Sequence, residues 1–176
     1  MLPDTFHTAR LKLRPIAPED AGPIFDGYAQ DTTVTRFVIW RPHRSRSDTD
    51  AYIAQCIATP PDVSRTYVLT DRTNGDVRGT FALRLAAPPP SRLRLRFGAS
   101  LVGPGPHDRS PHQVVNWALN QPGIFRIGAV CDVENIGSAR VMEKAGLFRE
   151  GLLRRWLMHP NISDEPRDCF IYARTQ

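Results

Sequence analysis

The residues best suited to chemistry lie at a polar turn, residues 135–138, that precedes a short helix. Asn135 and Ser138 stand at the start of an apolar pattern that runs to Ala145, and Gly146 follows it. An Asn or Ser side chain at a helix start accepts a hydrogen bond from an unpaired N–H group and contributes about 1 kcal/mol. The same polar groups can hold a ligand, so the residues themselves leave helix capping and ligand binding both open.

A loop rich in Gly and Pro, residues 102–108, leads into another helix. Ser110 suits the N-cap of this helix, and Pro111 suits its first position, where no N–H is needed. The buried face of the helix is predicted to consist of Val114, Val115, Ala118 and Trp117. The loop therefore stands directly before the start of a packed helix.

The elements that position these candidates follow from hydrophobic periodicity. Strands are predicted at residues 9–16, 66–70, 77–87, 93–101, 125–131, 148–158 and 169–173. Helices are predicted to begin at Pro18, Ser47, Ser110 and Ser138. Asn74-Gly75 favours a hairpin turn because both residues tolerate positive φ. This order predicts one α+β domain over residues 1–176, in which an antiparallel meander precedes a β-α-β unit.

Composition and charge are those of an ordinary globular domain. The 176 residues are 41% hydrophobic and 23% charged, with a net charge of +5. Lys12 and Lys144 are the only lysines, so arginine carries almost all of the positive charge. The arginines are scattered and are not interleaved with aromatic residues, which argues against nucleic-acid binding.

The cysteines and the chain start exclude further classes of protein. Cys56, Cys131 and Cys169 are odd in number and lack C-x-x-C spacing, which argues against a disulfide framework and against a zinc site. The start has no charged segment followed by an apolar one, and no stretch approaches the roughly 20 apolar residues of a membrane span. We expect a cytoplasmic protein that binds neither a metal nor a membrane.

Four stretches of the sequence resemble the GNAT acetyltransferases of the branch that includes the RimJ- and RimL-type ribosomal-protein enzymes. Residues 135–151 read N-x-x-S-x-R-V-x-E-K-A-G-L-x-x-E-G, and residues 8–15 read T-x-R-L-x-L-R-P. Residues 116–127 are similar to the family's third helix and fifth strand, and residues 159–168 to its C-terminal tail. The resemblance implies the GNAT (acyl-CoA N-acyltransferase) fold, a mixed twisted sheet of about six or seven strands with about four helices.

The resemblance also implies where acetyl-CoA binds. In the family the cofactor lies in a V between the fourth and fifth strands, and backbone N–H groups of a loop before the third helix hold its pyrophosphate. Asn135 would then meet the pantetheine arm, and Ser138 would lie near the thioester sulfur. The implied cofactor-binding residues are Leu101, Val102, Gly103, Gly105, His107, Arg109, Asn135 and Ser138.

Acetyl transfer to an amine needs a group that takes a proton from the amine and one that gives a proton to the thiolate. Candidates for the base are Glu150, Asp168 or a water held by backbone carbonyls. Ser138 and Tyr172 are candidates for the acid. The alternatives are an exposed surface position for Glu150 and a core position for Tyr172.

The acceptor side is expected after the first helix, where an aromatic residue stands beside a cation. The implied acceptor-binding residues are Trp40, Arg41 and Asp168. Trp40 is equally well explained as an ordered loop residue that covers the core. The acceptor implied by the resemblance is a primary amine, of a protein N-terminus or a small molecule, that attacks acetyl-CoA directly. A homodimer is left open.

The loop before the third helix departs from the family pattern. Val102 stands where Gln or Arg is usual, His107 where Gly or Ala is usual, and Asp108 adds a negative charge. Two prolines within the loop also remove backbone N–H groups. One hypothesis is that the loop still binds the diphosphate with help from Arg109. The other is a catalytically weak or inactive GNAT-fold binding protein that has lost normal CoA binding.

The sequence predicts that replacing Pro104 and Pro106 together with alanine tightens acetyl-CoA binding. Each N–H that points at phosphate contributes about 1.5–3 kcal/mol, and about 1.4 kcal/mol is a factor of ten in affinity. Regaining one such bond lowers the dissociation constant about tenfold in a calorimetric titration. Equal or weaker binding by the double variant would show that the prolines do not weaken acetyl-CoA binding. The length of the loop or Asp108 would then be the cause of weak binding.

Overall fold

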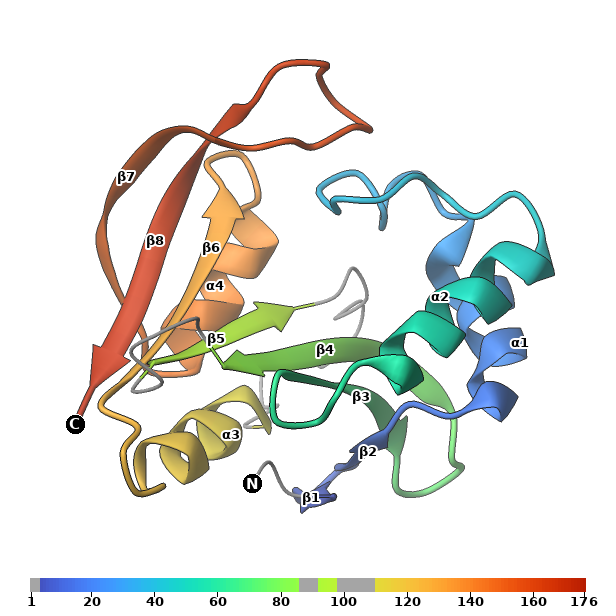
Figure 1. The fold of residues 1–176 in the computed structure, drawn as a ribbon, viewed down its shortest axis with the longest axis horizontal. Coiled ribbons are helices and arrows are strands. Elements are labelled where there is room, and N and C mark those ends of the chain that lie inside the picture. Colours follow the sequence, from blue (N-terminus) through green and yellow to red (C-terminus); the bar gives the residue numbers. More distant parts are fainter. Residues whose placement is uncertain (1–3, 86–91, 98–109) are drawn as a thin grey trace.

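The computed structural model describes residues 4–85, 92–97 and 110–176 (Figure 1). These residues form one eight-stranded sheet in the order β1-β2-β3-β4-β5-β6-β8-β7. The strands are β1 (Phe6–His7), β2 (Leu11–Pro15), β3 (Ser64–Asp71), β4 (Val77–Leu85), β5 (Arg92–Phe97), β6 (Arg126–Asp132), β7 (Phe148–Leu157) and β8 (Arg167–Thr175). The helical segments are a 3-10 turn (Pro18–Asp20), α1 (Ala21–Ile24), a π-helical turn (Phe25–Ala29), α2 (Arg46–Ala58), α3 (Ser110–Leu119) and α4 (Ile136–Lys144). The predicted α+β class and mixed sheet are confirmed; the short strand β1 was not predicted.

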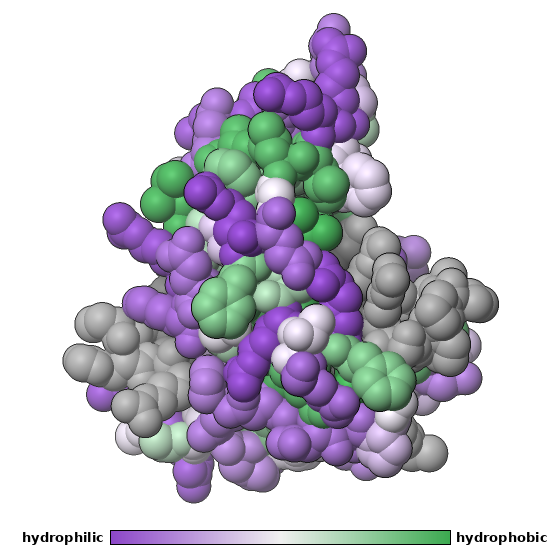
Figure 2. Space-filling view, turned by 90° about the vertical axis from the view of Figure 1, so that its left-hand side faces the viewer, coloured by the Kyte–Doolittle hydropathy of each residue, from purple (hydrophilic) through white to green (hydrophobic). Residues whose placement is uncertain are grey.

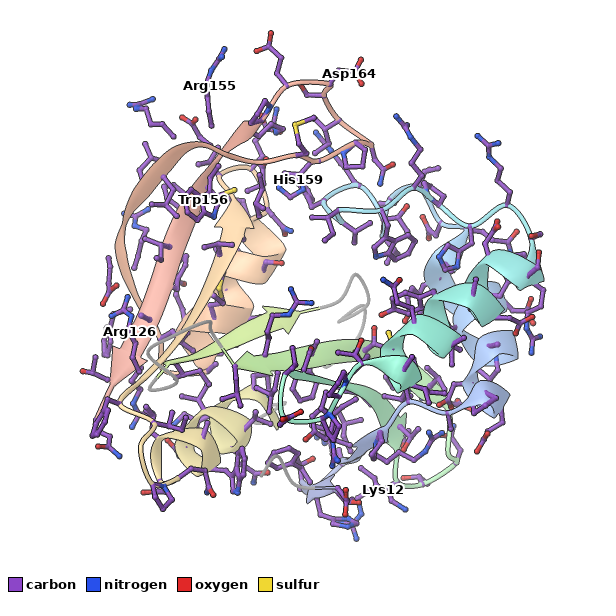
Figure 3. All side chains as sticks on the ribbon, in the orientation of Figure 1. Lys12, Arg126, Arg155, Trp156, His159 and Asp164 are labelled. Atoms are coloured by element: carbon purple, nitrogen blue, oxygen red, sulfur yellow. The ribbon has the colours of Figure 1, made fainter. Side chains whose placement is uncertain are left out.

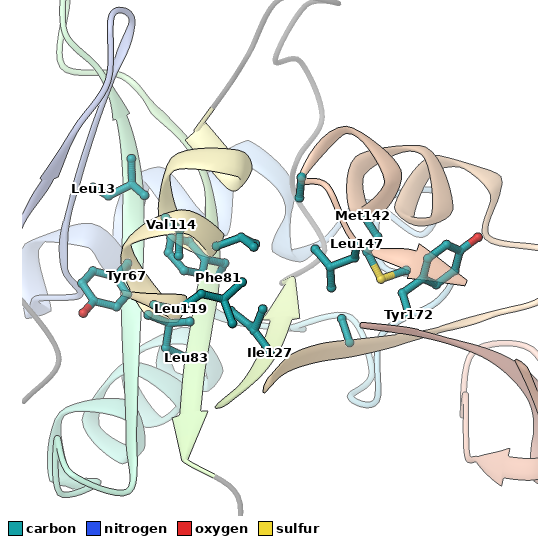
Figure 4. Close-up of a cluster of buried hydrophobic side chains, with 14 of the residues drawn as sticks. Leu13, Tyr67, Phe81, Leu83, Val114, Leu119, Ile127, Met142, Leu147 and Tyr172 are labelled. Atoms are coloured by element: carbon teal, nitrogen blue, oxygen red, sulfur yellow. The ribbon is translucent and has the colours of Figure 1, made fainter. Parts of the chain in front are cut away.

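The central strands bury side chains on both faces of the sheet, because successive residues of a strand point to opposite faces. In β3, Tyr67 and Leu69 join a cluster with α3 and α4, whereas Val68 between them joins a cluster with α1 and α2. The first cluster extends from Leu13 of β2 to Tyr172 of β8 (Figure 4). Helices therefore cover both faces of the sheet.

The helix α4 begins two residues earlier than the sequence predicts. The side chain of Asn135 is its N-cap, because Oδ1 accepts the backbone N–H of Ser138 at 3.0 Å. The predicted start at Ser138 was therefore wrong, and the helix begins at Ile136. Gly146, with φ +82°, ends the helix as predicted.

The strands β5 and β6 run parallel but pair over only three residues. Residues 92–94 lie opposite residues 126–128, and no pairing between the two strands continues beyond this in the described part of the chain. Their other edges remain paired, β5 with β4 and β6 with β8. This confirms the prediction that the two strands run side by side and then diverge (Figure 1). Residues 98–101 of the predicted strand lie outside the described residues.

The strand β7, at the edge of the sheet, carries exposed apolar and basic side chains together. Phe148, Leu152 and Trp156 are exposed, and the guanidinium of Arg149 lies 4.7 Å from the ring centre of Phe170. Figure 2 shows the side of the molecule on which β7 lies, where apolar groups gather in the upper part among hydrophilic ones. In the described residues, no helix has the length and apolar character that crossing a membrane requires.

Candidate active site

A cleft of about 870 Å³ opens beyond the point where β5 and β6 part. One wall is formed by residues 33–40 and α2, and the floor by β3 and β4. The opposite wall consists of the end of β6, the start of α4 and His159. Figure 3 shows side chains from these elements reaching toward the centre of the molecule. The volume falls within the roughly 300–1,000 Å³ of small-molecule sites.

Asn135 and Ser138 line this cleft at the start of α4. Although Oδ1 of Asn135 caps the helix, its Nδ2 group has no hydrogen-bond partner among the described residues. One side chain can therefore cap the helix with its oxygen and donate to a ligand with its nitrogen. Capping and ligand binding, left as alternatives by the sequence, are compatible here.

Asp132, the last residue of β6, is a buried carboxylate at the edge of the cleft and is 1% exposed. Nε and Nη2 of Arg167 donate to its two oxygens at 2.6 and 3.2 Å, and the N–H of Glu134 donates at 2.9 Å. Burial raises the pKa of Asp132, but these hydrogen bonds together outweigh it and hold the pKa below its usual range. The lining of the cleft thus contains a carboxylate that is held ionised in a buried ion pair with Arg167.

His159 lies just beyond β7 and is 3% exposed. Its Nε2 is 3.8 Å from Oδ2 of Asp132, and neither ring nitrogen has a hydrogen-bond partner in the described residues. Phe37 contacts the ring edge to face, with 6.3 Å between centroids. Asp132 and His159 were not among the predicted site residues. His159 stood within the family-like tail, but its spacing in one sequence gave no signal of a role.

Three rings lie on one wall of the cleft, and this wall is called the aromatic wall. Trp40 lies 4.8 Å from His43 and 6.3 Å from Tyr52, measured between ring centroids. Nδ1 of His43 is already engaged with the hydroxyl of Thr49 at 2.7 Å. Burial lowers the pKa of His43 more than the negative charge of Asp48 raises it. Burial also raises the pKa of Tyr52. This wall is apolar and aromatic and offers few ionised groups.

Two of the predicted catalytic residues, Glu150 and Tyr172, do not line the cleft. The guanidinium of Arg126 donates to both oxygens of Glu150, with Nη1 and Oε1 2.8 Å apart. These bonds hold the pKa of Glu150 below its usual value. Tyr172 is buried in the core, where its hydroxyl donates to Glu143 at 3.2 Å, and burial raises its pKa.

The remaining predicted site residues are placed as follows. Asp168 accepts from Nη1 of Arg154 at 3.1 Å and from the N–H of Arg155 at 2.9 Å, away from the cleft lining. Arg41 is exposed and is likewise not part of the lining, although its neighbour Trp40 is. Leu101, Val102, Gly103, Gly105, His107 and Arg109 lie outside the described residues. Where side chains are described, no group of three or more His, Cys, Asp or Glu could hold a metal ion.

The sequence comparison decides the family. Residues 10–147 match the family model described as the acetyltransferase (GNAT) domain. The chain belongs to the GNAT acetyltransferase family. No curated protein matches this GNAT chain by sequence.

Solved structures confirm the GNAT fold. A GNAT-family acetyltransferase from Bacillus anthracis is similar with a TM-score of 0.80 and 20% identity, over 97% of this chain and 98% of that one. The microcin C7 self-immunity acetyltransferase MccE, in complex with acetyl-CoA and AMP, has a TM-score of 0.82 and 17% identity, over 99% and 98%. RimL, the ribosomal L7/L12 α-N-protein acetyltransferase, in complex with coenzyme A, has a TM-score of 0.77 and 16% identity, over 96% and 95%.

The buried ion pair of this GNAT protein predicts a stability effect. Replacing Arg167 with Met leaves the Asp132 carboxylate buried without its partner, which lowers the free energy of unfolding by about 3 kcal/mol. Arg46→Met is the control, since its pair with Asp50 is exposed and contributes less than about 1 kcal/mol. Chemical denaturation at neutral pH measures both variants.

The stabilisation that the ion pair of Asp132 and Arg167 provides is expected to depend on pH. Because the folded pKa of Asp132 is lowered, the pair stabilises fully above the usual Asp pKa of about 4 and loses its effect as pH falls through the lowered value. Because burial alone raises the pKa of Asp132, folded Arg167→Met takes up a proton on this carboxyl group at a higher pH than folded wild type does, so the stability difference between the two shrinks as the pH falls. A difference that grows as the pH falls would contradict this assignment.

Proposed function

We propose that this GNAT protein transfers the acetyl group of acetyl-CoA to a primary amine, by direct attack of the amine on the thioester. The observation that carries the proposal is the divergence of β5 from β6, which opens into the cleft lined by Asn135 and Ser138. The family match and the likeness to structures that hold acetyl-CoA or coenzyme A support it.

The residues at the end of β6 fit the arm of acetyl-CoA. Beyond residue 128, the edge of β6 that faced β5 has no strand partner in the described residues, so its backbone groups can pair with an extended amide chain. Nδ2 of Asn135 adds an unpartnered donor. When bound, acetyl-CoA supplies an activated acetyl group, and we propose that the Ser138 hydroxyl, which lines the cleft, gives a proton to the departing sulfur.

The acceptor binds between the aromatic wall and the buried carboxylate. Trp40, His43 and Tyr52 provide apolar surface, and the ion-paired Asp132 lies on the opposite wall. RimL is by its description an enzyme for a protein N-terminus, whereas the MccE complex holds AMP. We therefore place the acceptor among peptide N-termini and small-molecule amines, and we place the reaction in the cytoplasm.

Two measurements test the function directly. Calorimetry first determines whether acetyl-CoA binds, and mass spectrometry then follows acetyl transfer to a panel of peptides and small amines. Binding with transfer to at least one amine is the expected result. If acetyl-CoA does not bind, the protein is instead a GNAT-fold binding protein that has lost the cofactor.

The two roles of Asn135 can be separated by substitution. Asn135→Ser keeps an oxygen that caps α4 but removes the Nδ2 donor, so it should leave the melting temperature nearly unchanged. Losing one hydrogen bond to the cofactor, worth about 0.5–1.5 kcal/mol, weakens acetyl-CoA binding up to about tenfold. Asn135→Ala loses both roles and should lower stability as well as affinity.

Asn120→Ala serves as the control for the loss of a helix-end hydrogen bond. Asn120 donates to the carbonyl of Asn116 at the end of α3, away from the cleft lining. Its substitution should leave the affinity for acetyl-CoA unchanged. If Asn135→Ser binds acetyl-CoA as tightly as wild type, Asn135 caps the helix and does not bind the cofactor.

A further inference from the structure

Among the described residues, the cleft contains one buried polar side chain that has no partner, His159. Both ring nitrogens lack a hydrogen bond although the residue is only 3% exposed. Leaving a buried polar group unsatisfied costs about 1–3 kcal/mol, and native proteins rarely retain such groups without a role. The ring is part of the cleft lining, and His159 is labelled in Figure 3.

The loop that carries His159 is fixed in place. The carbonyl of His159 accepts the N–H groups of Ile162 and Ser163 at 2.9 and 3.1 Å. Nδ2 of Asn161 donates to the carbonyls of Thr35 and Trp40 across the mouth of the cleft, at 2.7 and 2.8 Å. The ring of His159 is thus held between Phe37 and the end of β6.

A buried carboxylate lies beside the ring of His159. Asp132 is 3.8 Å from Nε2, and Arg167 holds that carboxylate in place from β8. Glu134 pairs with Arg167 and, at the exposed mouth, with Arg36. Both oxygens of Asp132 are occupied by Arg167, so the carboxylate is suited to stabilise a nearby cation rather than to accept a proton itself.

The other titratable side chains of the cleft lining are less suited to take a proton from an amine. Asp48 is exposed and accepts the N–H groups of Arg44 and Ser45, which lowers its pKa. Nδ1 of His43 is engaged with Thr49. Burial raises the pKa of Cys131 to about 12, so this thiol stays protonated. Histidine is also the side chain whose ordinary charge change lies closest to neutrality.

We propose that His159 is the proton acceptor for the attacking amine, an inference that rests on the function proposed above. A proton passes from the ammonium group to an unpartnered ring nitrogen of His159, directly or through one water, and Asp132 stabilises the imidazolium. The amine nitrogen then forms the C–N bond, the C–S bond of the thioester breaks, and coenzyme A leaves as its thiolate. The sulfur receives a second proton of the amine through the Ser138 hydroxyl, and the third stays on the amide nitrogen.

The inference is tested by separating the chemical step from cofactor binding. His159→Gln keeps a polar side chain of similar size but cannot take the proton, so kcat should fall about 100-fold or more. The dissociation constant for acetyl-CoA, measured by calorimetry, should stay within about twofold. His7→Gln, on the exposed edge strand β1, is the matched control and should keep the wild-type kcat.

Chemical rescue distinguishes a proton acceptor from a structural residue. In His159→Ala, added imidazole can occupy the space of the lost ring, and it should raise kcat in proportion to its concentration while wild type and His7→Gln do not respond. If the wild-type protein transfers no acetyl group, the proposed function fails. If wild type is active but His159→Gln keeps kcat within about threefold, or imidazole does not rescue a folded His159→Ala, the inference alone is wrong.

Discussion

The short parallel pairing of β5 and β6 is the constraint on which the rest of the site depends. Antiparallel partners hold both strands on their far edges, β4 along β5 and β8 along β6. When the two strands part after three residue pairs, each must follow its own partner. The sheet therefore opens beyond this point, and the groups at the end of β6 face a gap instead of a neighbouring strand.

Polar contacts between residues that are distant in sequence link the two sides of the cleft. Asn161 binds the backbone carbonyls of Thr35 and Trp40, and Arg36 pairs with Glu134. These contacts tie the segment after β7 to the segment before α2. The aromatic wall and the wall that carries His159 are consequently positioned relative to each other by hydrogen bonds between them.

Local features of this structure could be predicted from the sequence, because they depend on residues within a few positions. Gly146 ends α4, and the turn at Asn74-Gly75 joins β3 to β4, where Gly75 has φ +79°. The side on which Glu150 lies could not be predicted. Glu150 lies at a register irregularity of β7, between Arg149 and Gly151, where simple alternation no longer tells which side a residue faces.

His159 could not be predicted because the residues that surround it belong to elements distant in sequence. Asp132 is oriented by Arg167, 35 residues away in the sequence, and the ring is confined by Phe37. The separation of 3.8 Å between Nε2 and Oδ2 is longer than a hydrogen bond, so the resting ring is not committed to the carboxylate. A positive charge on the ring would strengthen this attraction, since charges interact more strongly in a buried site than in water. In the proposed mechanism, the buried carboxylate therefore lies beside the ring that receives the proton of the amine.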